Sequence, residues 1–253
     1  MTTTLPPTAQ HVAGPPETAG SIPQQQKGTA RAHNPRAFTD WVAQVSRDDP
    51  GARSALRSGL RKDLDSVRRM HRLVAPWLPE GRSADVERAY YAVAAMIASQ
   101  PRGALAAPDP ESTDDDPAHA DGEQMPAKSM RRRRVSLGTV FATAVAEGPG
   151  REKEMRAGTA ESRLNLLTRQ SVNGLHRHLP ASVGYLRSLD VDVDWAQLLD
   201  DLSNWRRNSG RISRTWLQDF YRLRARDAAR QADEADEKEL AADAEPAAAP
   251  ASL

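Results

Sequence analysis

Residues 83–102, SADVERAYYAVAAMIASQPR, decide the fold, because positions 89–98 are ten apolar residues without a break. Ser83 is a favourable N-cap, Asp85 places negative charge in the first turn, and Pro101 supplies a stop signal. Apolar residues also occur opposite the main helical stripe, so neighbouring helices are expected to cover more than one face. The run is too short to span a bilayer. We therefore predict a buried helix at the centre of an all-α fold.

Composition divides the chain into five segments. Residues 1–30 contain five prolines and no apolar periodicity, which predicts a disordered arm. Residues 103–130 are an acidic, proline-rich linker, and residues 227–253 are an acidic, alanine-rich tail. The segments 31–102 and 131–226 carry helical patterns and no alternating β pattern. The predicted architecture is an all-α, two-lobed helical bundle with an N-terminal lobe at 31–102 and a C-terminal lobe at 131–226.

Capping signals and apolar periodicity predict the helices of both lobes. In the N-terminal lobe, Asn34 and Asp49 are predicted N-caps, each followed by proline. A further helix is predicted to begin at Asp63, with His71 on its buried side. The C-terminal lobe is predicted to contain helices at 136–148, 159–170, 171–189 with a break near Pro180, 194–207 and 213–226. Beyond Arg226 the helix is expected to continue briefly and then fray.

The net charge of +1 conceals a segregation of charge along the chain. Residues 31–108 carry 13 basic and 8 acidic side chains, and residues 124–226 carry 19 and 10. Residues 109–123 carry 7 acids and no Lys or Arg, and residues 227–253 carry 8 acids and 2 bases. Basic lobes favour nucleic acid as a partner, although an ordinary solvated, arginine-rich surface has the same composition.

Cysteine content and the N-terminal residues bear on the compartment of the protein. The chain has no cysteine, which excludes disulfides and thiolate metal sites. The N-terminus, MTTTLPPTAQ, lacks the basic start and the apolar run of a signal peptide. We therefore expect a cytoplasmic protein without a membrane segment.

No assembled catalytic set is visible in the sequence. The motifs G-x-S-x-G, H-E-x-x-H, G-x-x-x-x-G-K-[ST] and G-x-G-x-x-G are absent. His176 and His178 are two residues apart, which on a helix points them to different sides, so a zinc pair is not expected. His71 is expected to be a packed histidine rather than a base. We predict neither enzymatic activity nor a cofactor or metal.

Arginine carries the remaining functional signal, with 30 Arg against 5 Lys. Its planar guanidinium suits phosphate contacts and stacking, although a base-composition bias in the genome would give the same ratio. The candidate nucleic-acid-binding residues are Arg61, Arg68, Arg72, Arg163, Arg169, Arg206, Arg207 and Arg211. The first three would form one stripe if their helix is continuous, unless Asp65 pairs with Arg68 and Arg69. The last three surround a helix C-terminus, where basic residues also compensate the helix dipole.

Six short segments, in this order, resemble a known family. They are HRLVAPWLP at 71–79, ERAYYAVAAMIA at 87–98, VSLG at 135–138, ESRLNLL at 161–167, VDW at 193–195 and WLQDFY at 216–221. In this order they are similar to the CasB family, the small subunit of the type I-E CRISPR surveillance complex, Cascade. The similarity extends over residues 34–224. Each segment alone could belong to an ordinary amphipathic helix. The resemblance therefore depends on all six segments occurring in the order of the family.

The resemblance implies a two-lobed helical protein without catalytic activity that packs as a pair of copies in the complex. Its implied partners are CRISPR RNA, target DNA and the backbone and large subunits of Cascade, and its basic surfaces would hold the DNA strands that the guide RNA separates. Carried over position by position, the implied binding residues are Arg57, Arg72, Arg163, Arg169, Arg206 and Arg207. The long N-terminal arm, the acidic linker and the acidic tail depart from the compact form of the family.

Two other functions fit parts of the sequence. A helix-turn-helix regulator would need two short helices, a tight turn and a polar recognition helix, whereas the predicted helices are longer and more apolar. A structural scaffold without nucleic-acid contact would use its arginines only in salt bridges. Weak, salt-sensitive and sequence-indifferent DNA binding distinguishes the complex subunit from the regulator, and an absence of binding favours the scaffold.

Overall fold

The architecture consists of helices in two layers. The computed structural model describes residues 1–2, 34–101, 105, 134–146 and 154–243. Within these residues every regular element is helical and no strand occurs, which confirms the predicted all-α class. The predicted arm at 1–30 and the predicted linker at 103–130 fall almost entirely outside the described residues.

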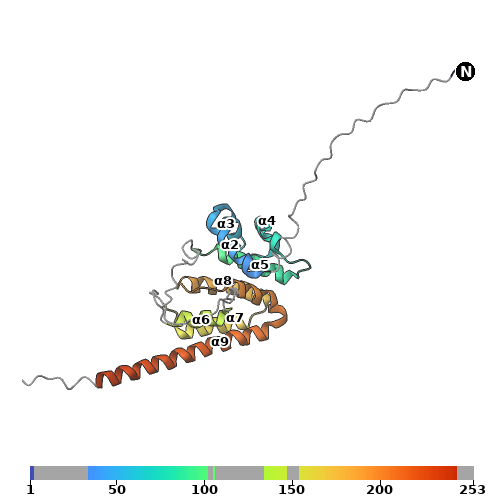
Figure 1. The fold of residues 1–253 in the computed structure, drawn as a ribbon. Helices are drawn as coiled ribbons and strands as arrows, with labels where there is room; N and C mark the ends of the chain where they lie inside the picture. Colours follow the sequence, from blue (N-terminus) through green and yellow to red (C-terminus); the bar gives the residue numbers. More distant parts are fainter. Residues whose placement is uncertain (3–33, 102–104, 106–133, 147–153, 244–253) are drawn as a thin grey trace, which may run out of the picture.

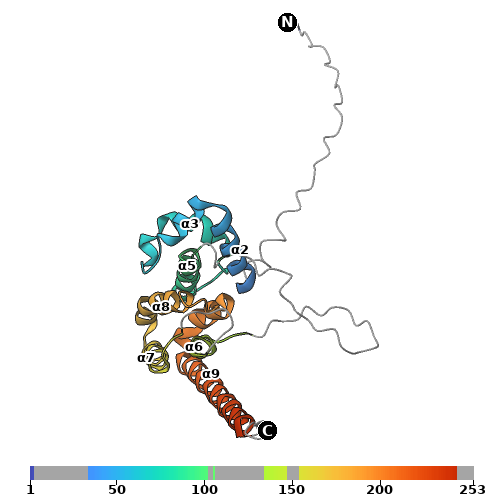
Figure 2. The ribbon, with the colours of Figure 1, turned by 90° about the vertical axis from the view of Figure 1, so that its left-hand side faces the viewer.

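One layer contains the N-terminal helices and the other contains the C-terminal helices (Figures 1 and 2). The first layer is formed by α2 (Pro35–Asp48), α3 (Pro50–Arg57), α4 (His71–Val74) and α5 (Ala84–Ala98). The second is formed by α6 (Leu137–Val145), α7 (Ala157–Thr168), α8 (Val172–Arg187) and α9 (Trp195–Asp243). Three short 3-10 turns surround α4: η1 (Leu64–Ser66), η2 (Arg68–Met70) and η3 (Ala75–Trp77).

Three helices of the first layer begin at the capping residues that the sequence predicted. The cap hydrogen bonds are accepted by Asn34 Oδ1 from the Ala37 N–H (3.1 Å), by Asp49 Oδ1 from the Gly51 and Ala52 N–H groups (2.7 and 2.9 Å), and by Ser83 Oγ from the Val86 N–H (3.4 Å). Each bond satisfies a backbone donor that the first turn of the helix leaves without a partner. Both predicted proline starts lie at the first helical position.

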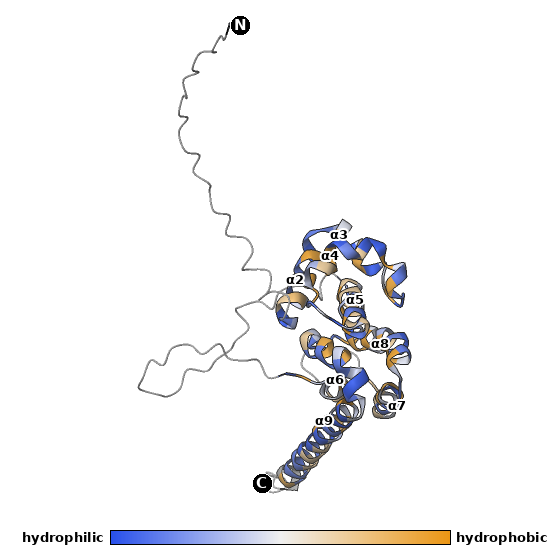
Figure 3. Ribbon diagram, turned by 90° about the vertical axis from the view of Figure 1, so that its right-hand side faces the viewer, coloured by the Kyte–Doolittle hydropathy of each residue, from blue (hydrophilic) through white to orange (hydrophobic). Residues whose placement is uncertain are grey.

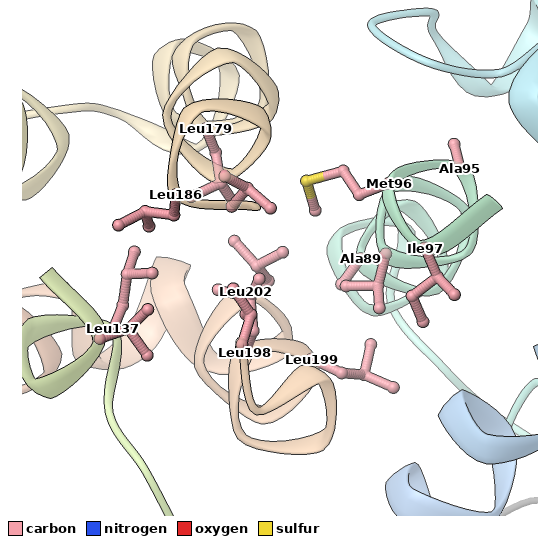
Figure 4. Close-up of a cluster of buried hydrophobic side chains, with 14 of the residues drawn as sticks. Ala89, Ala95, Met96, Ile97, Leu137, Leu179, Leu186, Leu198, Leu199 and Leu202 are labelled. Atoms are coloured by element: carbon pink, nitrogen blue, oxygen red, sulfur yellow. The ribbon is translucent and has the colours of Figure 1, made fainter. Parts of the chain in front are cut away.

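The helix α5 lies at the centre of the fold, as predicted from its apolar run. Every residue from Ala89 to Ala98 is buried except Ala92, which is half-buried. The helix packs against α2 and α3 on one side and against α8 and α9 on the other. Figure 4 shows Met96 directed toward α8 and Ile97 directed toward α9. Because both layers cover α5, one continuous hydrophobic core joins them.

The core of the second layer is built around two tryptophans of α9. The rings of Trp205 and Trp216 lie 5.1 Å apart, and each is almost completely buried. The Trp216 Nε1–H donates to Asp201 Oδ2 at 2.8 Å. Burial raises the pKa of the Asp201 carboxyl to about 6, although the hydrogen bonds from Trp216 and Gln197 act in the opposite direction. Buried tryptophans therefore form the core here, and they are not available for stacking on bases.

The helices α6 and α9 approach each other at backbone distance. A Cβ atom added at Gly138 would lie 2.5 Å from the carbonyl carbon and 2.8 Å from the Cα of Trp216, and closer still to the carbonyl oxygen. Real Cβ atoms do not approach backbone atoms this closely, so only glycine allows α6 to lie where it does.

The predicted helix that opens at Asp63 is wrong. The segment forms the turns η1 and η2 and the single turn α4, and Val67 between η1 and η2 has the non-helical angles φ −106° and ψ 34°. Packing explains the break, because Val67 and Met70 are both drawn into the core against Gly59. His71, predicted to face inward, is exposed, and its Nδ1 forms a hydrogen bond of 2.6 Å with the hydroxyl of Tyr91.

The second layer departs from the predicted helix boundaries in two places. The predicted break near Pro180 is wrong, because α8 continues through this residue. Burial of Leu179 and Val183 on either side of the proline outweighs the loss of one backbone hydrogen bond. The division into helices at 194–207 and 213–226 is confirmed in outline, because α9 consists of two helices joined by a kink at Asn208 (φ −129°, ψ 17°). The second helix continues to Asp243, well beyond the brief extension expected after Arg226.

Candidate nucleic-acid interface

Four of the predicted arginines come together where α7 ends against α9. The Trp205 Nε1–H donates to the Gln170 carbonyl oxygen at 3.0 Å, and the Ser213 Oγ–H donates to the Thr168 carbonyl oxygen at 3.1 Å. These bonds hold the turn that carries Arg169 against the part of α9 that carries residues 206–211. Arg169, Arg206, Arg207 and Arg211 are all exposed there. The structure therefore gathers them on one end of the second layer.

Arg206 forms an ion pair with a residue of the first layer. Its guanidinium forms a two-pronged ion pair with Asp85 in the first turn of α5, with 2.9 Å between Nη2 and Oδ1 and a second contact from Nε to Oδ2. The hydrogen bond from Arg206 lowers the pKa of the Asp85 carboxyl, and burial opposes this effect. The Arg206 side chain remains 69% exposed. It is thus accessible to a phosphate, which would have to compete with Asp85.

Arg163 makes a different contact from the other predicted residues. Its Cζ lies 4.6 Å from the centroid of the Tyr185 ring, so the guanidinium stacks between α7 and α8. The side chain is half-buried, and within the described residues it forms no salt bridge. Stacking fixes the plane of the guanidinium and leaves its N–H groups able to donate within that plane.

The N-terminal arginines do not lie on one helical stripe. Arg57 ends α3, Arg61 lies in a turn with the left-handed angle φ 61°, Arg68 lies in η2 and Arg72 lies in α4, and all four are exposed. The stripe predicted for Arg61, Arg68 and Arg72 is wrong, because no continuous helix joins them. Packing of Gly59 on Val67 and Met70 nevertheless brings the chain around Arg57 and Arg61 next to η2. In the part of the chain that the structure describes, Asp65 forms no salt bridge with Arg68 or Arg69.

A groove between the two layers connects these clusters. A cavity of about 270 Å³ is lined by Arg61, Lys62, Arg88, Arg177 and polar residues that include Asn173 and His176. Asn173 also lines a neighbouring cavity of about 320 Å³, which it shares with Arg206. Arg206 in turn lines a third cavity of about 480 Å³, together with Arg82 and Arg207. Because consecutive cavities share a lining residue, we treat them as one groove, which we call the interlayer groove. Its charged lining is mainly basic, with Asp63, Asp85 and Asp200 as the acidic members.

Arg88 fixes the two walls of the interlayer groove. From α5 it forms a salt bridge of 3.1 Å with Asp63 Oδ1 and donates a hydrogen bond to Asn173 Oδ1 on α8. Sequence reasoning missed Lys62, Arg88 and Arg177, because packing of separate segments is what brings them together. No local spacing in the sequence signals this arrangement.

His176 lines the groove as a neutral side chain. It is only 8% exposed, and burial, reinforced by the nearby Arg88, lowers the pKa of its imidazole to about 4. The groove is therefore basic through arginine and lysine at neutral pH, without a contribution from this histidine. Within the described residues no group of three His, Cys, Asp or Glu side chains is placed to hold a metal ion.

The outer side of α9 carries a second basic surface. Arg211, Arg214 and Arg222 follow the kink at Asn208 and recur at helical spacing, and Arg207 directly precedes the kink. All four are exposed and form no salt bridge within the described residues. We call these four residues the α9 arginine face. They lie opposite Trp205, Ile212, Trp216 and Phe220, which are buried against the core. Arg214 and Arg222 were not predicted, although the helical spacing in the sequence is sufficient to find them.

These features define a class of protein: a small all-helical protein whose basic side chains line a groove between two helical layers and one side of its longest helix. Residues 52–221 match the model of the CRISPR-associated protein Cse2 family, so the chain belongs to this family. This confirms the resemblance found in the sequence, since Cse2 and CasB denote the same family.

Solved structures agree with the family assignment. A chain of a CRISPR RNA-guided surveillance complex is 34% identical, with a TM-score of 0.62, and the match covers 79% of this chain and 98% of that chain. A chain of such a complex in a pre-nicking state gives the same values. A Cse2-family protein from Thermus thermophilus is 20% identical, with a TM-score of 0.50 over 74% of this chain and 97% of that chain, and it supports the fold alone. No curated protein matches the chain, and no described helix is long and apolar enough to cross a membrane.

Proposed function

We propose that the chain is the non-catalytic small subunit of a type I-E CRISPR RNA-guided Cascade complex. In this role it binds nucleic acid without sequence preference and stabilises the opened strands of the target DNA. The observation that carries the proposal is the convergence of exposed arginines from distant parts of the chain on the interlayer groove and the α9 arginine face. The 34% identity to a chain of a CRISPR RNA-guided surveillance complex supports the assembly.

A subunit without an active site is sufficient for this function. In a guide-directed complex base pairing reads the sequence, and exchange of the DNA duplex for the RNA–DNA duplex is close to energetically balanced. A few phosphate contacts on the separated strands then shift the balance toward the open state. Exposed guanidinium groups that lack an acidic partner are suited to such contacts, because binding a phosphate breaks no existing ion pair.

We assign the contacts to the predicted arginines together with those that the structure adds. The proposed residues are Arg57, Arg61, Arg68, Arg72, Arg163, Arg169, Arg206, Arg207 and Arg211 from the sequence, and Lys62, Arg88, Arg177, Arg214 and Arg222 from the structure. The partners in this proposal are CRISPR RNA, target DNA, the backbone and large subunits and a second copy of the chain. We further propose that residues 31–102 and residues 131–226 act as the two lobes of this subunit.

Two contacts favour a scaffold as the second candidate function. The ion pair between Arg206 and Asp85 joins the two layers, and the stacking of Arg163 on Tyr185 joins α7 to α8. Both contacts would stabilise the subunit without any nucleic acid. A scaffold does not explain the α9 arginine face, however, because these four residues have no ion-pair partner among the described residues.

The test uses the complex assembled with its partner subunits and CRISPR RNA. Target-DNA affinity is measured over a series of salt concentrations for the wild-type subunit and for a variant with Arg207, Arg211 and Arg214 replaced by alanine. Arg230→Ala is the matched control, since Arg230 is paired with Glu234 at 3.0 Å. Normal assembly with lower affinity and a shallower salt dependence supports the proposal. Normal assembly with wild-type affinity and salt dependence refutes it and leaves the scaffold.

A further inference from the structure

One cavity of the interlayer groove has features that contacts to a phosphate backbone do not use. It is the cavity of about 270 Å³ between the turn after α3, α5 and α8, at the place where the two layers meet (Figure 3). We call it the α5–α8 pocket. A strand that passes along the groove needs exposed cations for its phosphates and no enclosed space. The volume of the pocket is just below the roughly 300–1,000 Å³ of pockets for drug-sized ligands, so it suits one small group.

The cationic side chains with no acidic partner lie at the mouth of the pocket. Arg61, Lys62 and Arg177 are exposed, and none of them forms a salt bridge among the described residues. Arg88 is less exposed, at 23%, and Asp63 neutralises it through the salt bridge of 3.1 Å. Guanidinium and ammonium groups without a partner are suited to a phosphate. The mouth of the pocket therefore suits an anion.

The most buried residues that line the pocket carry no charge. Val67, Tyr91 and His176 are 2%, 3% and 8% exposed. The imidazole of His176 is neutral at neutral pH, because burial and the nearby Arg88 lower its pKa to about 4. A charged group would be costly in these surroundings, whereas a neutral polar group is tolerated where it finds hydrogen bonds. The interior therefore suits an uncharged polar group.

His176 has hydrogen-bonding capacity that the protein does not use. Its side chain is more than nine-tenths buried and lines the pocket, and among the described residues nothing forms a hydrogen bond with the imidazole. A neutral imidazole offers one donor and one acceptor. On the same wall, Asn173 Oδ1 accepts from Arg88, which leaves the amide N–H groups of Asn173 able to donate. Because buried polar groups are normally paired, the free imidazole points to a ligand.

We propose that the α5–α8 pocket holds one nucleotide. The base lies in the interior, against His176 and Asn173. The phosphate lies at the mouth, on Arg61, Lys62 and Arg177. A nucleotide joins a flat, neutral, polar heterocycle to an anion, and the pocket divides the same two chemistries between its interior and its mouth. Since every base presents both donors and acceptors on its edge, size is the main selection, and it favours the smaller pyrimidines.

The nucleotide has two possible sources. One is a base turned out of a bound strand, and this source rests on the proposed function. Turning out a base has its lowest cost in single-stranded nucleic acid, because no base pair has to be broken. The other source is a free nucleotide, which requires no strand and does not rest on the proposed function. The chemistry of recognition is the same for both sources.

Binding of single strands to the full chain tests the first source. Fluorescence anisotropy compares an oligothymidylate with a strand of the same length in which every residue is abasic, so that the phosphates remain and the bases are missing. The wild-type chain should bind the oligothymidylate about tenfold more tightly, which is the factor expected for about one well-placed hydrogen bond. Ala92→Leu fills the pocket and leaves every cation in place. It should remove this difference without changing the affinity for the abasic strand.

Equilibrium dialysis of radiolabelled thymidine 5′-monophosphate against the full chain tests the second source. The wild-type chain should bind one molecule, and inorganic phosphate at the same concentration and ionic strength should not displace it. Ala92→Leu and His176→Leu should each raise the dissociation constant at least about tenfold. Ala228→Leu is the matched control, because it makes the same change as Ala92→Leu at an exposed position of α9. Helix content measured by circular dichroism checks that every variant is folded.

The outcomes separate the pocket from the proposed function. A base effect that Ala92→Leu removes supports a base turned out of a strand. Saturable monophosphate binding that depends on Ala92, without a base effect, supports a free nucleotide. If neither strand binds, the proposed function fails and the dialysis alone decides the pocket.

Three results would overturn the proposal. The first is equal binding of the two strands together with no saturable binding of the monophosphate. The second is a base effect and monophosphate binding that Ala92→Leu leaves unchanged, which would place the nucleotide elsewhere. The third is displacement of the monophosphate by inorganic phosphate at equal concentration, which would show that only the mouth is occupied.

Discussion

Substituting Gly138 by alanine tests whether α6 and α9 meet at backbone distance. The added Cβ would lie 2.5 Å from the carbonyl carbon of Trp216, and the atoms it meets belong to the backbone, which cannot rotate aside. Overpacking in a well-packed core costs about 1–3 kcal/mol, and a clash with backbone belongs at the upper end of this range. Alanine regains up to about 1 kcal/mol of helix propensity. The net loss of unfolding free energy is therefore about 2 kcal/mol.

The measurement is urea denaturation of the full chain, followed by circular dichroism. Gly184→Ala is the matched control, because Gly184 lies inside α8 with no atom within 4 Å of the added Cβ. This variant should gain about 0.5–1 kcal/mol, since only the helix-propensity effect remains. A Gly138→Ala protein that is as stable as the wild type, or that gains as much as Gly184→Ala, would refute the backbone contact.

Three further outcomes are expected. Replacing three residues of the α9 arginine face by alanine should flatten the salt dependence of target-DNA binding by the assembled complex by roughly one unit of slope per lost contact, as measured by filter binding across a salt series. The pKa of Asp201 is raised to about 6 in the folded state, so between about pH 4 and 6 the folded protein binds more protons than the unfolded protein, and the contribution of Asp201 to stability falls as the pH rises. The pKa of His176 is lowered to about 4 in the folded state, so the contribution of His176 to stability rises from about pH 4 to 6.5. The two effects oppose each other in the wild type, so urea denaturation of Asp201→Asn should show stability that rises across this window, and His176→Gln should show stability that falls; a flat profile in both variants would contradict the burial of these groups. Asp85→Asn should free Arg206 and raise the nucleic-acid affinity of the complex severalfold, and unchanged or lower affinity in a correctly assembled complex would show that Arg206 does not contact phosphate.

Local signals in the sequence were sufficient for the helix starts and for the central helix. Asn34, Asp49 and Ser83 each cap a helix through a hydrogen bond that involves residues two or three positions ahead, so no tertiary information is needed. The ten apolar residues of α5 likewise predict that several faces of this helix are buried, and this prediction does not require knowing which helices cover it. These predictions succeed because the interactions that decide them lie within a few residues along the chain.

Predictions that depended on packing failed or were incomplete. The segment that starts at Asp63 has helical periodicity, but insertion of Val67 and Met70 against Gly59 divides it into turns. The interlayer groove could not be predicted, because Arg88 and Arg177 come from different layers and only the tertiary fold places them side by side. The α9 arginine face is different, since its spacing was present in the sequence from the start.

The position of α5 on the side of the first layer that meets the second also sets an order of events during synthesis. One side of this helix is covered by α9, and Leu202 of α9 follows Ala98 by about 100 residues. At about 5–20 residues per second, the ribosome needs roughly 5–20 s to add them. For most of this interval the nascent N-terminal layer exposes an apolar helix face whose partners, α8 and α9, have not yet been made. The chain is therefore most vulnerable to aggregation midway through translation, when the protection of a chaperone matters most.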